Sequence, residues 1–216
     1  MKSDYSLDLY LVTDRALSLG RPLADIVEGA LRGGVTMVQL REKTASTREF
    51  VELAQHIKTF TQSYNVPLII NDRLDVAQAV DSDGVHLGQN DMPYEIARRL
   101  LGPDKIIGLS VESVVHAQAA EALDVDYLGV SPIYFTPTKT DLTVELGLEG
   151  LRQIKRISRH PLVAIGGMNF RTLADVVKTG ADGIAVVSAI CSAADPQRAA
   201  HDLYSLIAKT KSEDSL

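Results

Sequence analysis

The stretch TMVQLREK, residues 36–43, places polar side chains at regular intervals along an apolar run. On a β-strand, positions i, i+2 and i+4 point to the same face. Gln39, Arg41 and Lys43 therefore share one face, while the residues between them point the other way. The pattern predicts a buried strand whose carboxyl end presents an amide and two cations, and paired cations indicate an anionic partner.

Short apolar runs of this kind recur along the chain and alternate with longer amphipathic stretches. Each run is apolar on nearly every residue, which is typical of a strand covered on both faces. The stretch after the second run opens with Ser46 and Glu49, spaced as in a helical capping box. The expected strands are residues 7–14, 36–42, 67–73, 84–89, 106–111, 127–133, 161–167 and 183–189.

Eight strand–helix units in succession predict a closed barrel. Parallel strands need crossover helices, and right-handed crossovers close such a series on itself. We therefore predict an α/β fold, a single (β/α)8 TIM barrel domain over residues 1–216, with short flexible tails at about 1–6 and 212–216. The alternative is a doubly wound open sheet, but no Gly-x-Gly-x-x-Gly fingerprint follows the first expected strand.

Composition restricts the partners and the compartment. The formal net charge of −6 and the pI of about 5.4 argue against general binding to nucleic acid or to an anionic membrane. Cys191 is the only cysteine, so no internal disulfide can form, and the count fits a reducing compartment. We see no signal peptide and no long apolar run, so we expect a cytoplasmic protein without a membrane span.

Polar residues gather at the carboxyl ends of the expected strands, where TIM barrels carry their chemistry. Asp72 and Asp91 follow neighbouring strands and offer hard oxygen ligands next to the cations at residues 41 and 43. Carboxylates beside a basic anion site commonly hold Mg²⁺. One alternative is a plain salt bridge between Asp72 and either cation. Two cations and two acids at one end favour a magnesium–pyrophosphate site.

A second anion site is predicted after the last two strands. The run 161–167 ends in Gly166-Gly167, and loops at this position of a barrel often bind phosphate through backbone N–H groups. The alternative is a simple tight turn. The longest connection, residues 134–147, carries threonines and Lys139 that suit phosphate, although it could be a solvated loop. His86 lies inside a strand and is expected to be a hydrogen-bonded barrel residue.

Several segments together resemble the thiamine-phosphate synthase (thiamine-phosphate pyrophosphorylase) family. They are LYLVTD, GGVTMVQLREK, LIINDR, DGVHLGQNDMP, IIGLSVES, DYLGVSPIYFTPTKTD, VAIGGMN and GADGIAVVSAI, which span residues 9–190. VHLGQ-x-D and TPTK are specific in this combination. Ser131 departs from the pattern, because the family often has glycine there.

The resemblance implies an Mg²⁺-dependent transferase of thiamine biosynthesis. Its reaction joins 4-amino-2-methyl-5-(diphosphooxymethyl)pyrimidine to 4-methyl-5-(2-phosphooxyethyl)thiazole and releases pyrophosphate and thiamine phosphate. The displacement is expected to be dissociative, through a carbocation-like methylene. The implied partners are these small molecules, with no nucleic acid or membrane. The sequence does not decide whether the chain forms a homo-oligomer.

The resemblance also assigns roles to residues that match the family motifs. Metal binding falls on Asp72 and Asp91. Catalytic roles fall on Arg41, Lys43, Ser110 and Lys139. The substrate-binding set is Gln39, Leu40, Arg41, Glu42, Lys43, Asn71, Ser110, Thr136, Pro137, Thr138, Lys139, Gly167, Val187 and Ser188.

Two other functions fit the same barrel. A thiazole tautomerase-like relative would need an acid/base residue and would not need both metal carboxylates. A non-catalytic phosphate-binding barrel would keep the site after the last two strands and could lose the metal pair. The presence of both aspartates together with the cations favours the synthase.

Overall fold

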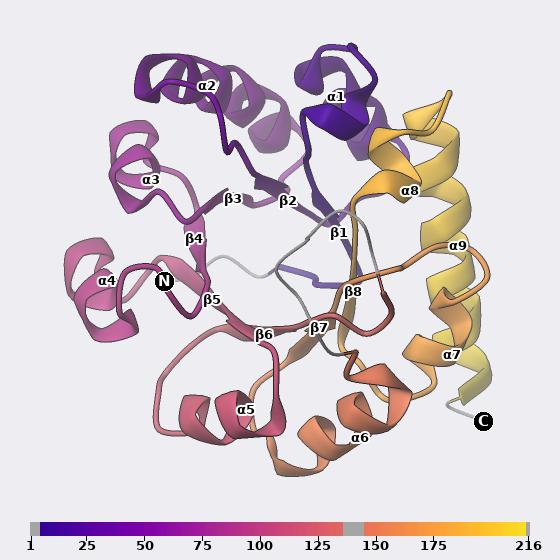
Figure 1. Ribbon diagram of the computed structural model, residues 1–216. Coiled ribbons are helices and arrows are strands. Elements are labelled where there is room, and N and C mark those ends of the chain that lie inside the picture. The colour runs from indigo at the N-terminus through magenta and orange to yellow at the C-terminus, as the bar shows by residue number, and fades with distance from the viewer. Residues whose placement is uncertain (1–4, 136–144, 215–216) are drawn as a thin grey trace.

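The computed structural model describes residues 5–135 and 145–214, and within these ranges eight parallel strands close into a barrel (Figure 1). Each strand pairs with the next in chain order, and β8 pairs with β1. The predicted (β/α)8 fold is confirmed, and the open-sheet alternative is wrong. The strands are β1 Leu9–Val12, β2 Met37–Leu40, β3 Leu68–Asn71, β4 Gly84–Leu87, β5 Ile106–Val111, β6 Tyr127–Val130, β7 Leu162–Ala164 and β8 Gly183–Val186.

Helices follow the strands and surround the barrel (Figure 1). The Ser46–Glu49 capping box is present at the start of α2, as its spacing predicts. None of the helices in the described ranges is long and apolar enough to cross a membrane. They are the 3-10 turn η1 Ala16–Ser18 and α1 Leu23–Arg32, α2 Thr47–Ser63, α3 Leu74–Val80, α4 Tyr94–Leu101, α5 Val114–Ala120, α6 Gly147–Ile157, α7 Leu173–Val177, α8 Ser188–Cys191 and α9 Pro196–Asp214.

Seven of the eight expected strands extend beyond the observed ones, and in the last of them a helix begins within the expected range. The apolar run 183–189 predicts a strand to its end, but β8 stops at Val186 and α8 begins at Ser188. The backbone turns at Val187, with φ −117° and ψ −83°, which lies outside the β region. A short apolar run does not separate a buried strand from a buried helical turn, so periodicity misses this boundary.

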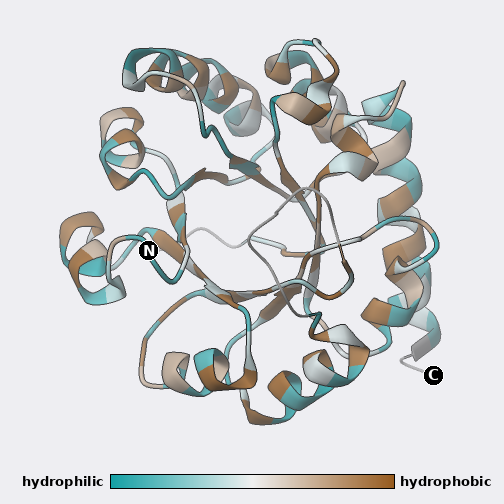
Figure 2. Cartoon of the chain, viewed as in Figure 1, coloured by the Kyte–Doolittle hydropathy of each residue, from teal (hydrophilic) through white to brown (hydrophobic). Residues whose placement is uncertain are grey.

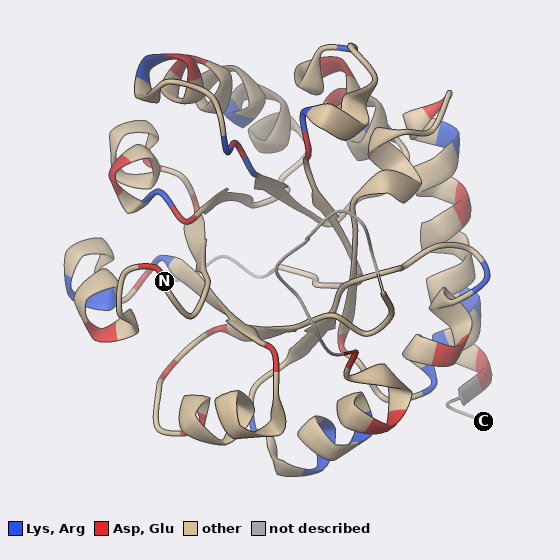
Figure 3. Ribbon diagram, viewed as in Figure 1, with Lys and Arg blue, Asp and Glu red and all other residues tan. Residues whose placement is uncertain are grey.

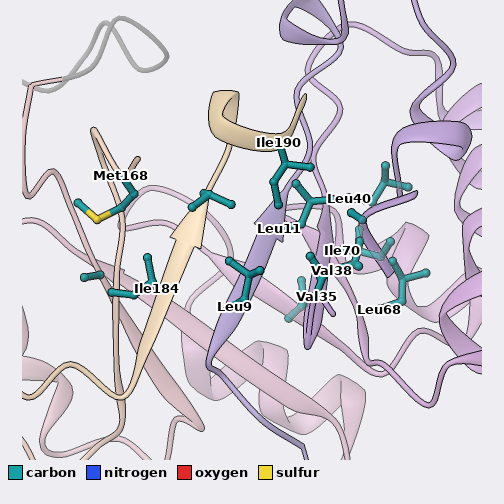
Figure 4. Close-up of a cluster of buried hydrophobic side chains, with 14 of the residues drawn as sticks. Leu9, Leu11, Val35, Val38, Leu40, Leu68, Ile70, Met168, Ile184 and Ile190 are labelled. Atoms are coloured by element: carbon teal, nitrogen blue, oxygen red, sulfur yellow. The ribbon is translucent and has the colours of Figure 1, made fainter. Parts of the chain in front are cut away.

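Alternate residues of each strand enter two separate apolar cores. Leu9 and Leu11 of β1 pack between the barrel and its helices, together with Val38 and Leu40 of β2 (Figure 4). Tyr10 of β1 instead points into the barrel and joins a smaller interior cluster. In Figure 2 the helices carry both hydrophobic and hydrophilic stretches, and the strands that they surround are largely hydrophobic. Both faces of each strand are therefore buried, which explains the nearly continuous apolar runs.

Helix α1 packs closely against α9 through two glycines that differ in the space around them. A Cβ on Gly33 would lie 2.3 Å from the carbonyl oxygen of Gln197 and 2.6 Å from Cβ of Ala200. A Cβ on Gly29, one turn earlier, would lie 3.5 Å from Cβ of Pro196, which is ordinary van der Waals contact. The contact between the two helices thus requires glycine at the second position and tolerates alanine at the first.

We expect Gly33→Ala to lower the free energy of unfolding by about 1–3 kcal/mol, because α9 must move away from α1. Gly29→Ala is the matched control, and it should raise stability by up to about 1 kcal/mol because alanine favours the helical backbone. Urea denaturation followed by circular dichroism compares the two midpoints. Equal midpoints would show that the two helices do not pack as closely as described.

Candidate functional site

The carboxyl ends of the strands surround one cavity, as the polar strand ends predict. Residues of every strand or of the segment just after it contribute to the lining. The described lining residues are Tyr10, Val12, Gln39, Arg41, Asn71, His86, Ser110, Tyr127, Gly129, Ser131, Pro132, Val163, Ile165, Gly166, Gly167, Met168, Ala185, Val187 and Ser188.

Gln39 and Arg41 line this cavity, and the Arg41 guanidinium forms an ion pair. The Arg41 guanidinium lies 2.8 Å from Oδ2 of Asp14, which follows β1. The backbone N–H of Arg41 also donates to Oγ1 of Thr13, at 3.0 Å. The end of β1 therefore holds Arg41 in place beside the cavity.

Lys43, Asp72 and Asp91 are not among the described residues that line the cavity; they lie where β2, β3 and β4 end, a position that we call the rim. There Lys43 and Asp72 form an ion pair, with Nζ 2.5 Å from Oδ2. Figure 3 shows basic and acidic residues next to each other where β2 ends. Of the plain salt bridges weighed for these cations, the pair of Lys43 with Asp72 is present, whereas Arg41 binds Asp14 instead. Asp72 adopts a left-handed backbone with φ 59°, a conformation that aspartate tolerates better than most side chains.

Asp91 adjoins this ion pair, so two carboxyl groups meet beside one ammonium. Burial acts to raise the pKa of Asp72, but hydrogen bonds from Lys43 and Asp91 outweigh it and hold that pKa below its usual value. Burial raises the pKa of Asp91, and the hydrogen bond with Asp72 raises it further. The backbone N–H of Gly88 donates to Oδ2 of Asp91 at 2.7 Å and fixes its orientation. The two acids therefore have opposite pKa shifts, because they repel each other when both are charged.

The donor set at this rim suits a hard dication. Two carboxyl groups at one place can bind Mg²⁺, which commonly takes its other ligands from water and phosphate oxygens. A dication between Asp72 and Asp91 would remove the repulsion that separates their pKa values. Among the described residues no group of three or more His, Cys, Asp or Glu side chains is placed to hold a metal.

A chain of side-chain hydrogen bonds crosses the floor of the cavity. Gln39 Nε2 donates to the phenol oxygen of Tyr10 at 2.9 Å, and that oxygen lies 2.8 Å from the phenol oxygen of Tyr127. The Tyr127 oxygen lies 3.0 Å from Nδ1 of His86, whose Nε2 lies 2.8 Å from Oγ of Ser110. His86 is thus a hydrogen-bonded barrel residue, as expected, and it links a predicted site residue to two tyrosines.

Two glycines make room for this chain. A Cβ on Gly108 would lie 2.1 Å from the Tyr127 ring and 2.6 Å from Nδ1 of His86. A Cβ on Gly129 would lie 2.9 Å from Cε1 of His86. The histidine and tyrosine rings stack with centroids 5.5 Å apart in the space that these glycines leave. Glycine inside a strand often marks such a close approach, and this signal could have drawn attention to Tyr127.

The second anion site of the sequence prediction lies on another side of the same cavity. Gly167, Val187 and Ser188 all line it. Gly166 and Gly167 have φ of +105° and +67°, values that favour glycine. A Cβ on Gly167 would lie 2.7 Å from Cβ of Tyr134, so the backbone at this position is also closely packed.

Two predicted substrate contacts have side chains that point elsewhere. Leu40 is fully buried in the core between the barrel and its helices. Glu42 binds Arg15 through two hydrogen bonds, at 2.9 and 3.0 Å. Neither residue is in the described lining of the cavity, in keeping with the alternation along β2. Asn71 and Ser110 do line it, whereas four predicted residues lie outside the described ranges: Thr136, Pro137, Thr138 and Lys139.

Comparison of the sequence with those of known proteins identifies the family to which the chain belongs. The model of the thiamine monophosphate synthase family matches residues 9–190. The thiamine-phosphate synthase of Syntrophomonas wolfei is 53% identical over 203 residues, which cover 94% of this chain and 96% of the relative. That of Albidiferax ferrireducens is 54% identical over 202 residues, covering 94% and 92%.

Solved structures agree with these relatives. Thiamine phosphate pyrophosphorylase from Pyrococcus furiosus superposes with a TM-score of 0.87 at 43% identity, covering 94% of this chain and 96% of that one. A geranylgeranylglyceryl phosphate synthase from Thermoplasma acidophilum, at TM-score 0.70 and 16% identity, shares the fold alone. The residue motifs, the barrel and these matches lead to one conclusion: the chain belongs to the thiamine monophosphate synthase family.

Proposed function

We propose that this chain is an Mg²⁺-dependent thiamine-phosphate synthase. It joins 4-amino-2-methyl-5-(diphosphooxymethyl)pyrimidine to 4-methyl-5-(2-phosphooxyethyl)thiazole, with release of pyrophosphate. The observation that carries the proposal is the gathering of Arg41, Lys43, Asp72 and Asp91 at one mouth of the barrel, in a chain that belongs to this family. The acidic chain with its buried single cysteine fits a cytoplasmic enzyme.

Asp72 and Asp91 would hold the Mg²⁺ ion at the rim. When bound, the ion supplies positive charge to the diphosphate oxygens, where negative charge grows as the leaving group departs. Arg41 and Lys43 add fixed cations on the same side of the cavity and bind the diphosphate. Asp14 keeps the Arg41 side chain beside the cavity, at 2.8 Å, so little reorganisation is needed when the substrate enters.

The pyrimidine would occupy the cavity between Gln39, Asn71 and Ser110, all of which line it. Because the side chains of Leu40 and Glu42 point away, any contact from these two residues would come from the backbone. Lys139 belongs to the expected diphosphate contacts and lies outside the described residues.

The thiazole phosphate would bind on the side of Gly167, Val187 and Ser188, with Thr136 to Thr138 completing that site. Glycine backbone with positive φ can bring its N–H groups close to phosphate oxygens. Holding the phosphate there would aim the thiazole nitrogen at the pyrimidine methylene, and positioning of this kind supplies much of a rate enhancement.

In the bond-breaking step, the C–O bond between the methylene and the diphosphate breaks, and its electron pair leaves with pyrophosphate. The electron-rich aminopyrimidine carries the resulting positive charge. The lone pair of the thiazole nitrogen then forms the new C–N bond. No proton must be removed from that nitrogen, so the reaction needs cations and fixed positions more than it needs a general base.

The first test is direct. We expect the purified protein with both substrates and Mg²⁺ to form thiamine phosphate and pyrophosphate in equal amounts, to lose activity in excess EDTA and to regain it when Mg²⁺ is restored. Chromatography measures thiamine phosphate, and a coupled assay measures pyrophosphate. Folded protein that forms no product would reject the synthase. Isomerised thiazole without condensation would support a tautomerase-like relative, and phosphate binding alone would support a non-catalytic barrel.

Asp72→Ala tests the metal assignment. We expect it to lower kcat by at least about 100-fold, because Mg²⁺ would lose a carboxylate ligand and be held less tightly at the departing diphosphate. Mg²⁺ affinity, measured by calorimetry, should fall as well, while the circular dichroism spectrum stays unchanged. Asp75→Ala is the matched control, since Asp75 on α3 pairs with Arg73, which precedes the helix, and is not among the described residues that line the cavity. Parental turnover and Mg²⁺ affinity in Asp72→Ala would remove this residue from the site.

Lys139→Ala tests the role of the connection after β6. We expect single-turnover chemistry to slow by about 100-fold, because a cation that stabilises the departing pyrophosphate is missing. Rapid-quench measurement of the first turnover separates this step from product release. Lys178→Ala removes an exposed lysine after α7 and should keep the parental rate. A parental rate in Lys139→Ala would show that this lysine takes no part in bond breaking.

A further inference from the structure

The strands divide the lining of the cavity into a polar part and an apolar part. Strands β2, β3, β4 and β5 each contribute one described lining residue from within the strand, and all four are polar. These residues are Gln39, Asn71, His86 and Ser110. The lining residues within β7 and β8 are instead Val163 and Ala185, and β1 adds Val12 and Tyr10. We call Val12, Val163 and Ala185 the apolar wall.

The apolar wall offers water no hydrogen bond from a side chain. Its three residues are buried, and each of their strands pairs with a neighbouring strand on both sides, which engages the backbone polar groups. Tyr10 is the polar residue in this part of the described lining, but its oxygen already lies within hydrogen-bond distance of Gln39 and Tyr127. A buried water needs several polar partners, and apolar cavities stay dry. Water is therefore not stabilised on this side of the cavity.

Val12 lies between the two proposed substrate sites. In the barrel register, Val12 is the partner of Gln39, on the side proposed for the pyrimidine. The residue before Val12 is the partner of Val186, and Val187 belongs to the side proposed for the thiazole phosphate. A methylene group that is transferred from the diphosphate to the thiazole would therefore pass beside this part of the apolar wall.

Water competes with the thiazole for this methylene group. Once the C–O bond has broken and its electron pair has left with pyrophosphate, the lone pair of a water oxygen can form a new C–O bond. The water then gives up a proton to the solution, and the product is 4-amino-5-hydroxymethyl-2-methylpyrimidine. Pyrophosphate is released in this way without thiamine phosphate. Active sites that exclude water suppress such hydrolysis of reactive intermediates.

We propose that Val12, Val163 and Ala185 are specificity-determining residues, which keep water away from the methylene and so direct the reaction to the thiazole. The inference rests on the proposed function, which supplies the two substrate sites and the positively charged methylene. The rim binds a hydrated ion and a polyanion in that function, so its charged groups attract water rather than exclude it. The barrier against water therefore belongs to the strands β7, β8 and β1.

The test measures how the methylene divides between thiazole and water. The intact protein reacts with both substrates at saturation and Mg²⁺ in heavy-oxygen water, and chromatography with mass detection measures thiamine phosphate and the pyrimidine alcohol. We expect the parent to release pyrophosphate and thiamine phosphate in equal amounts. Val12→Thr keeps the shape of valine and adds a hydroxyl that can hold a water. We expect it to raise the ratio of alcohol to thiamine phosphate about tenfold, the effect of one hydrogen bond to water, with heavy oxygen in the alcohol.

Val163→Thr makes the same change on β7 and serves if Val12→Thr does not fold. Val115→Thr is the matched control, because Val115 is exposed on α5, and it should keep the parental ratio.

A merely structural role for the two valines would lower both products together, and an unchanged ratio would overturn the inference. Alcohol without heavy oxygen would overturn it as well, because that product arises from P–O cleavage and not from attack of water on carbon. A parent that makes thiamine phosphate but releases a large excess of pyrophosphate would show that the wall does not exclude water, and the synthase function would stand. If the parent forms no thiamine phosphate, the proposed function is rejected, and the inference fails with it.

Discussion

The closeness of Asp72 and Asp91 beside Lys43 is the constraint on which the chemistry of the barrel mouth depends. Two neighbouring carboxyl groups cannot both be charged without strong repulsion, and the pKa values of Asp72 and Asp91 are shifted in opposite directions. One ammonium, at 2.5 Å from Asp72, offsets part of the charge. A dication would offset the rest, and this is the physical basis of the metal site that we propose at the rim.

Ion pairs and hydrogen-bonded polar side chains occupy different places around the cavity. Ion pairs lie where the strands end, while the floor consists of phenols, an amide, an imidazole and a hydroxyl joined by hydrogen bonds. Such a division suits a substrate with a polyanionic end and a neutral ring. It also suits a reaction in which a leaving group must be stabilised and a ring must be held still.

Much of this arrangement follows from the sequence. Alternation along residues 36–43 correctly separates the cavity-lining Gln39 and Arg41 from Leu40 and Glu42, whose side chains point away. The eight apolar runs predict a parallel sheet covered by helices on its outer face, and eight strand–helix units in succession favour its closure into the barrel that is observed. The polar strand ends then have to meet at one mouth, whatever the details of the connecting loops.

Other features depend on contacts between residues that are far apart in the sequence. The hydrophobic periodicity of a single segment does not predict such contacts. The pairing of Arg41 with Asp14 rather than Asp72 is set by the β1–β2 register. The contact of Tyr10 with Tyr127 joins residues 117 positions apart. The turn from β8 into α8 at Val187 lies within a continuous apolar run, where strand and helix give the same pattern.

The central claim is that charges at the mouth let the diphosphate leave before the thiazole attacks. Positional isotope exchange tests it most directly, with heavy oxygen placed in the C–O–P bridge of the pyrimidine diphosphate and no thiazole phosphate present. If the bond breaks reversibly, heavy oxygen should move from the bridge to the non-bridging positions when Mg²⁺ is present and stay in place when it is removed. Label that remains in the bridge while the complete reaction proceeds would contradict the account.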